Sequence, residues 1–176
     1  MQRRRVVTGH DAEGRSVFVI DEAMEPVTLS VLPGGEFHQM WARDAPATLP
    51  SDAAAPDAWR YFPPADGFRF GCFTLGPESG TLPDDLDLPA ALAEVQQRLP
   101  GMNEVMEPDH PGMHTTDTVD FDIVLSGEVW LELDDGQEVH LRPGDCVIQN
   151  GTRHAWHNRT SEPVTVAVAL VGARRG

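Results

Sequence analysis

The chain has 176 residues, enough for one domain with a substantial core, and its 28 acidic and 13 basic residues give a formal charge of -15. This charge opposes binding to nucleic acid, whose phosphates would repel it, and no run approaches the roughly 18 apolar residues that span a membrane. The composition therefore predicts a soluble, cytoplasmic protein and argues against nucleic acid as a partner.

Short apolar runs separated by turns predict strands in the first part of the chain. They are Arg4–Thr8, Ser16–Ile20, Val27–Leu32, Phe37–Ala42 and Phe68–Leu75. The segment Ala45–Pro64 is rich in Ala, Pro and Asp without an apolar period, which predicts a long loop over the surface or over the mouth of a pocket.

One helix is predicted at Leu88–Leu99, where apolar residues recur every three or four positions before Pro100-Gly101 ends the pattern. After it, turns at near-regular spacing predict a meander of short strands. They are Asn103–Met106, Thr118–Leu125, Glu128–Leu133, Glu138–Leu141, Asp145–Gln149, Arg153–His157 and Pro163–Val171. Such a series is typical of a sandwich, jelly roll or barrel.

Two segments contain the candidate catalytic and metal-binding side chains. The first runs from His114-Thr-Thr-Asp-Thr-Val-Asp120 to Ser126-Gly127, and the second from Pro143-Gly-Asp145 to Gly151-Thr-Arg-His154-Ala-Trp-His-Asn158. Because alternate residues of a strand share a face, the first segment places its polar side chains on one side and apolar ones on the other. The polar side holds His114, Thr116, Thr118, Asp120 and Asp122. The same parity groups His154, Trp156 and Asn158 and turns Arg153 and His157 away.

These segments resemble the two motifs of the cupin superfamily, with Thr116 in place of a metal-binding histidine, Asp120 in place of a glutamate and Gln149 in place of a proline. The resemblance covers the chain from about residue 103 to the carboxyl end. It implies an all-β fold, the cupin double-stranded β-helix or jelly-roll barrel, with an N-terminal β extension and one short helix. We expect residues 1–80 to extend the barrel and to serve a homodimer, and residues 81–176 to form the barrel with its preceding helix.

The resemblance implies a site for one divalent metal, Fe, Zn, Ni or Mn, held by His114, Asp120 and His154. Two imidazoles and a carboxylate match the donors of non-haem iron oxygenases and also suit Lewis-acid chemistry. Asp122 and Thr116 are the candidate catalytic residues, and Trp156, Asn158 and Thr118 are expected to shape the substrate pocket. The implied function is a metal-dependent oxygenase, lyase, isomerase or cyclase acting on a small organic molecule.

Two alternatives stay open. One is a metal-free cyclase or isomerase that uses the pocket carboxylates, and the other is a non-catalytic module that binds a small molecule. His110 on a turn is an alternative third imidazole, and Glu104 and Glu107 are possible neighbours of the pocket. Cys72 and Cys146 lie in apolar runs and are expected to be buried, inert thiols.

Overall fold

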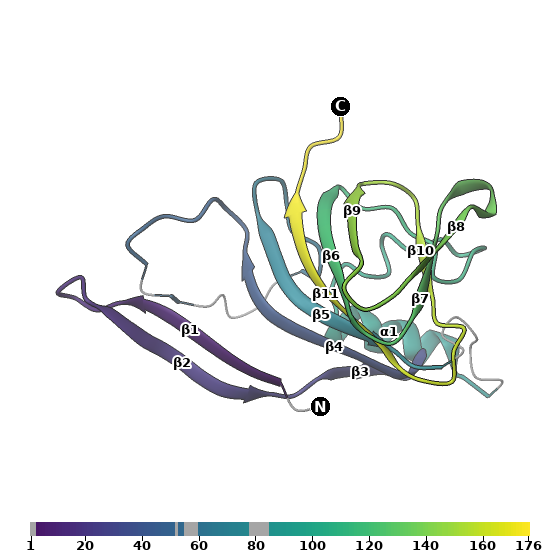
Figure 1. The fold of residues 1–176 in the computed structure, drawn as a ribbon, viewed down its shortest axis with the longest axis horizontal. Coiled ribbons are helices and arrows are strands. Elements are labelled where there is room, and N and C mark those ends of the chain that lie inside the picture. Colours follow the sequence, from purple (N-terminus) through teal and green to yellow (C-terminus); the bar gives the residue numbers. More distant parts are fainter. Residues whose placement is uncertain (1–2, 52, 55–59, 78–84) are drawn as a thin grey trace.

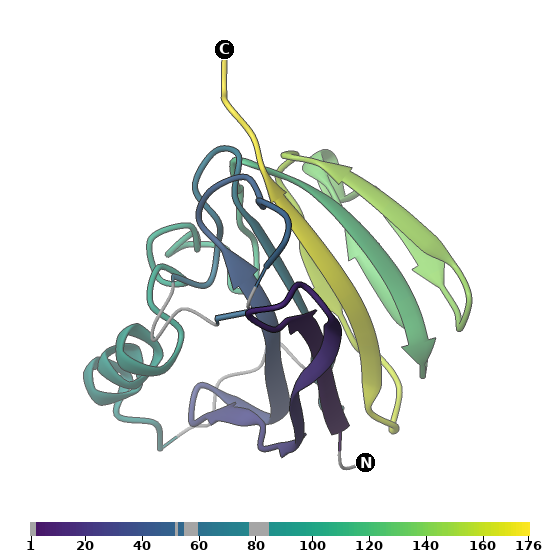
Figure 2. The same ribbon diagram turned by 90° about the vertical axis from the view of Figure 1, so that its left-hand side faces the viewer.

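The computed structural model describes residues 3–51, 53–54, 60–77 and 85–176. Its strands form a six-stranded sheet, a three-stranded sheet and a separate hairpin, and the described part has one α-helix, which lies between β5 and β6 in the chain (Figures 1 and 2). The predicted all-β cupin architecture with one short helix is therefore confirmed. The boundary expected at residue 80 lies outside the described residues.

The six-stranded sheet has the order β3 (Val27–Leu29), β4 (Leu32–Arg43), β5 (Phe68–Leu75), β11 (Val164–Gly172), β6 (Thr118–Ser126) and β9 (Cys146–Asn150). All of its neighbouring strands are antiparallel. The small sheet has the order β10 (Ala155–His157), β7 (Val129–Glu132) and β8 (Glu138–Leu141). A single turn of 3-10 helix, Asp134–Gly136, joins β7 to β8.

The core lies between the two sheets, where apolar side chains of both pack together. Val166 and Phe73 come from the large sheet, and Val129 and Leu131 come from the small one. Because strand residues alternate between faces, each of these strands gives only half of its side chains to the interior.

Helix α1 (Leu88–Arg98) covers one end of the barrel beside β3. The carboxylate of Asp87 caps it by accepting a hydrogen bond from the Ala90 amide, and Ala91 and Val95 form its buried face. Glu94 accepts hydrogen bonds from the Ser30 amide and hydroxyl, which fixes the helix to the turn after β3. The helix is thus scaffold, as its apolar period predicted.

The N-terminal hairpin of β1 (Arg3–His10) and β2 (Ser16–Met24) projects away from the barrel (Figure 1). It contacts the body through a hydrogen bond from the Arg5 guanidinium to the Met40 carbonyl and through His10 at Ser51. Most of β2 is exposed on both faces. Nothing else of this chain in the described part pairs with the hairpin as a strand.

Two expectations about the chain are wrong. Asn103–Met106 is a series of turns in which only Met106 forms a bridge, to His114, because the segment folds back on itself through amide bonds such as that from Val105 to the Met102 carbonyl. Cys146 is exposed because the parity of β9 turns it to the outer face of the sheet, whereas Cys72 is buried as expected.

Among the described residues no helix is long and apolar enough to cross a membrane.

Candidate functional site

Strand β6 directs three polar side chains into the barrel. Thr118, Asp120 and Asp122 are almost completely buried. The alternate residues Phe121 and Ile123 are about half exposed on the outer face of the strand. Asp120 lies opposite Leu170 of β11, and Asp122 lies opposite Val168. The predicted division of this strand into a polar face and an apolar face is therefore confirmed, and the polar face is the inner one.

Burial dominates the electrostatics of the two carboxylates. Loss of hydration raises the pKa of Asp120 to about 6, against the opposing effect of a hydrogen bond from Thr118. Loss of hydration raises the pKa of Asp122 to about 7, and the neighbouring charge of Asp120 adds to this rise. The Oδ1 atom of Asp120 has no hydrogen-bond partner. The pair is thus able to hold or release a proton near neutral pH.

No arginine pairs with these carboxylates within the described part of the chain. The sequence contains no lysine, so all 13 basic residues are arginines. Arg69, the buried one, is engaged by the Arg60, Arg43 and Phe68 carbonyls and by Asp44. The interior around Asp120 and Asp122 therefore has negative or neutral groups and no compensating cation.

His114 of the first motif and His154 of the second lie side by side. Each amide donates to the carbonyl of the other at 2.9 Å, and the ring centroids are 4.2 Å apart. The Nδ1 atom of His114 lies 3.0 Å from the Gly112 carbonyl oxygen, and that of His154 lies 2.9 Å from the Thr152 carbonyl oxygen. A carbonyl only accepts, so each Nδ1 carries the proton and each Nε2 presents a lone pair.

Both imidazoles are held neutral. Burial lowers the pKa of His154 to about 4, with a further contribution from His114, and burial also lowers the pKa of His114. A neutral ring with a free Nε2 and a hydrogen-bonded Nδ1 is the form that binds metal ions. The two histidines therefore fit a metal ion.

The third predicted ligand is less well placed. Among the described residues, the three-donor set whose atoms all lie within 4.8 Å is Glu132, Glu138 and His157, on the outer face of the small sheet, and not the predicted set. The structure thus brings His114 and His154 together, but Asp120 does not form a three-donor set with them within that distance. These three residues already have partners: His157 Nε2 lies 2.6 Å from Glu132 Oε2, and Arg159 forms an ion pair with Glu138.

A chain of aromatic contacts borders the site. Trp156 lies between Phe73 and His154, with ring centroids 5.8 and 6.2 Å away. On the other side Phe62 lies 6.3 Å from His114, and Tyr61 lies 5.0 Å from Phe62. The site is therefore lined by flat apolar surfaces as well as by carboxylates.

Tyr61 and Phe62 are the site residues that sequence reasoning missed. They lie in the segment predicted as a loop over the pocket mouth, where the amide of Tyr61 donates to the Pro100 carbonyl at 2.8 Å. Burial raises the pKa of Tyr61, and the charges of Asp122 and Asp120 raise it further, so the phenol keeps its proton. Adjacent aromatic residues in an otherwise Ala-, Pro- and Asp-rich segment were the available signal.

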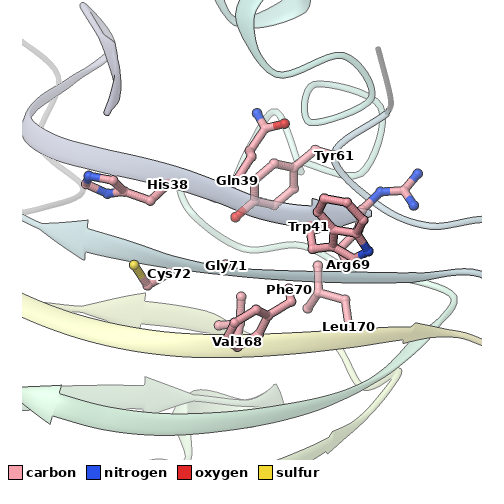
Figure 3. A pocket seen from close by; sticks show the side chains of 10 residues that line it. All are labelled: His38, Gln39, Trp41, Tyr61, Arg69, Phe70, Gly71, Cys72, Val168 and Leu170. Atoms are coloured by element: carbon pink, nitrogen blue, oxygen red, sulfur yellow. The ribbon is translucent and has the colours of Figure 1, made fainter. Parts of the chain in front are cut away.

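A small open hollow lies at the bulge of β4 between Gln39 and Trp41, and neither Asp120 nor Asp122 lines it. Figure 3 shows Tyr61 near Gln39 and Trp41 of β4, with Arg69 and Gly71 on β5 and Val168 and Leu170 on β11 beyond it. Val168 and Leu170 are the register partners of Asp122 and Asp120. The hollow and the two carboxylates therefore lie one strand apart, on either side of β11.

The remaining predicted residues have defined partners. The hydroxyl oxygens of Thr116 and Thr118 lie 2.7 Å apart. The Asn158 side-chain nitrogen donates to the carbonyls of Leu75, Gly76 and Glu162, and its oxygen accepts from the Thr160 amide and hydroxyl. Glu104 pairs with Arg60, and Glu107 pairs with Arg153 through two contacts of 2.7 Å. His110 is exposed on its turn and does not join the two histidines in a three-donor set.

Comparison with known proteins agrees with this architecture. Residues 103–171 match the family described as Cupin domain. The chain therefore carries a cupin domain, and the resemblance found in the two motifs is confirmed.

The relatives are fungal proteins. The chain is 29% identical to "Phomopsin biosynthesis cluster protein C'" of Diaporthe leptostromiformis over 89% of this chain and 70% of that protein. It is 29% identical to "Cupin-domain-containing oxidoreductase srdB" of Neurospora crassa over 90% of this chain and 67% of that protein.

A crystal structure from Thermotoga maritima described as a predicted oxalate decarboxylase is 15% identical, with a TM-score of 0.46 over 85% of this chain and 93% of that one.

Proposed function

We propose that this protein is a cupin enzyme that acts on a small organic molecule, with a divalent metal held by the imidazoles of His114 and His154. The observation that carries the proposal is the pair of Nδ1 contacts to backbone carbonyls, which leave both Nε2 atoms free to bind a metal, on rings whose centroids are 4.2 Å apart. The unpartnered Oδ1 of Asp120 is the candidate third donor. A bound metal would supply Lewis-acid or redox chemistry at the open positions.

The residues around the metal site divide the remaining work. Asp122 is the proton donor or acceptor, because its buried carboxyl is half protonated near neutral pH. The Thr116 and Thr118 hydroxyls form a bonded pair that holds Asp120 through Thr118. Trp156 and Phe62 border the histidines on both sides and exclude water from them.

The lining favours an uncharged, flat substrate. An anion would meet two buried carboxylates that no arginine neutralises, since Arg69 is engaged by Asp44 and backbone carbonyls. A neutral aromatic ring would stack on the aromatic side chains and offer a hydroxyl to Asp122. The names of the relatives, a biosynthesis cluster protein and a cupin-domain oxidoreductase, support chemistry on small organic molecules.

Calorimetric titration of the purified protein with Zn²⁺, Ni²⁺, Mn²⁺ and, without oxygen, Fe²⁺ tests the metal. We expect one ion per chain, lost in the His114→Gln/His154→Gln double variant. The matched control is His157→Gln, which removes a donor from the competing set with Glu132 and Glu138. Binding that survives in the double variant and disappears in the control would contradict the proposal.

The second candidate is a metal-free cyclase or isomerase, favoured by the buried Asp120 and Asp122 pair without a counter-cation. It predicts turnover of uncharged phenols, followed by mass spectrometry, that persists in EDTA and is lost in Asp122→Asn. Turnover that stops in EDTA and returns with added metal would reject it in favour of the first.

A further inference from the structure

One row of residues on the inner face of the large sheet leads from the hollow to the acidic pair. Strand register aligns Gln39 of β4 with Gly71 of β5, then with Val168 of β11 and Asp122 of β6. Since neighbouring strands lie about 4.8 Å apart, the backbones of Gln39 and Asp122 are separated by about 14 Å along this row. The row therefore has a polar side chain at each end and small or apolar residues between them.

Gly71 leaves the middle of this row without a side chain. A Cβ there would lie 2.4 Å from the His38 carbonyl oxygen, so the close approach of β4 requires glycine. Gly71 and Val168 both line the hollow, and Tyr61 lines it together with Gln39 (Figure 3). The hollow is thus the open part of the row at its β4 end.

Two side chains of the hollow have hydrogen-bonding groups that are not in use. Within the described part of the chain, neither the Tyr61 hydroxyl nor the Gln39 carboxamide has a hydrogen-bond partner. Burial and the nearby carboxylates raise the pKa of Tyr61, so its phenol keeps the proton that it can donate. Arg69 also lines the hollow, but Asp44 and backbone carbonyls engage its guanidinium. The hollow therefore offers neutral donors and acceptors, and its arginine is already paired.

We propose that the hollow is a substrate subsite, in which the Tyr61 hydroxyl and the Gln39 carboxamide bind the polar end of the substrate that lies farthest from Asp122. This subsite rests on the proposed function, in which Asp122 meets the reacting hydroxyl at the other end of the row. The roughly 14 Å between the two ends, less a hydrogen bond of about 3 Å at each, matches a ligand about 8 Å long. The substrate class is thus a flat, uncharged molecule of two fused rings with a hydroxyl or carbonyl group at each end.

Tyr61 is the only tyrosine in the sequence, which makes the hollow directly observable. Protein labelled with carbon-13 at the tyrosine ring carbon that bears the hydroxyl gives one such NMR signal. The probe is 2,6-dihydroxynaphthalene, and we expect the signal to shift saturably as this diol is added. Naphthalene-2,6-dicarboxylate should cause no shift, because its charged ends would find no unpaired cation in the described lining. Absence of a saturable shift up to about 1 mM diol would overturn the proposal.

A cycle of ligands and variants separates hydrogen bonding from a merely structural role. In calorimetric titrations Tyr61→Phe should weaken binding of the diol by about 5- to 10-fold. It should leave unchanged the affinity for 2-naphthol, whose single hydroxyl lies at Asp122, and this unchanged affinity also shows that the variant is folded. Gln39→Leu should act in the same direction as Tyr61→Phe. The matched control is Gln97→Leu, on the exposed side of α1, which should leave both affinities unchanged.

Equal weakening of the two ligands by Tyr61→Phe would contradict a role for its hydroxyl. The same titrations in the His114→Gln/His154→Gln double variant separate the subsite from the metal. If Tyr61→Phe still discriminates the diol from 2-naphthol in that background, the subsite stands, whether or not the wild type binds a metal. If the discrimination disappears with the two imidazoles, the diol binds at the histidines and the subsite is rejected.

Discussion

At the scale of single residues, the two buried carboxylates carry the largest electrostatic cost in the site. Asp120 and Asp122 are each less than 6% exposed and no arginine of the described chain pairs with them. A residue that destabilises its own fold in this way is a mark of a functional position.

The first prediction concerns pH. The pKa values of both carboxyls lie above the ordinary 3.8, so between about pH 4 and 7 the folded protein binds more protons than the unfolded chain, and stability falls as pH rises. Asp122→Asn removes the charge and should raise the free energy of unfolding at pH 8 by about 2–4 kcal/mol, with little effect at pH 4. Urea unfolding at both pH values measures it.

The control for this variant is Asp135→Asn, at an exposed residue with φ of 58°, a conformation that asparagine also adopts. Its stability should follow the wild type at every pH. If Asp122→Asn also follows the wild type, the two carboxyls are not the source of the pH dependence.

Asn158 gives a second prediction at this scale. Its amide nitrogen donates to three carbonyl oxygens and its side chain is 1% exposed. Asn158→Asp would place a carboxylate oxygen against those carbonyls and should cost about 3–5 kcal/mol at pH 8, less at pH 4 where the carboxyl is protonated. Asn150→Asp, on an exposed position of β9, is the control, and equal losses in the two variants would contradict this role.

At the scale of elements, the β6–β7 turn fixes how the polar strand enters the barrel. Gly127 has a φ of 75°, and a Cβ added there would lie 2.6 Å from the Pro163 carbonyl oxygen and 2.7 Å from the Val164 Cα. The close approach of β11 to this turn therefore requires glycine for two reasons, backbone conformation and space.

A matched pair of glycines separates these reasons. Gly136 has a φ of 67°, but a Cβ there would meet nothing within 4 Å. Gly136→Ala should cost about 1 kcal/mol for the left-handed backbone alone, whereas Gly127→Ala should cost about 3 kcal/mol or more because backbone must also move. Thermal unfolding of both variants measures the difference. Equal costs would mean that the turn accommodates the added methyl group.

At the scale of the whole molecule, the excess of acidic residues weakens the fold through self-repulsion. Raising NaCl from 20 to 300 mM at pH 7.5 screens this repulsion and should increase Tm by about 2–4 °C, which corresponds to about 1 kcal/mol for a chain of this size. Near pH 5, close to the sequence pI of 4.6, the same salt step should have almost no effect. A salt effect that is equal at the two pH values would point to a cause other than net charge.

The fold was largely predictable because strand alternation and turn residues are local properties. The period of two between Thr118 and Leu125 fixed which side chains share a face, and the structure places Asp120 and Asp122 inside and Phe121 outside. The turns of 103–106 were misread as a strand because a few apolar residues in a short run carry no information about the partner that a strand requires.

Spacing along the chain was enough to predict the strand parity and the shared face of the candidate residues, and the resemblance of two motifs to the cupin family predicted the fold class. Tertiary structure alone decided that His114 and His154 pair through their backbones, that Tyr61 reaches the acidic pair from a distant loop, and that no arginine neutralises it. It also decided that the apolar face of β6 stays uncovered in one chain. Contacts between residues far apart in sequence depend on how the sheets curve and close, and no local pattern contains that information.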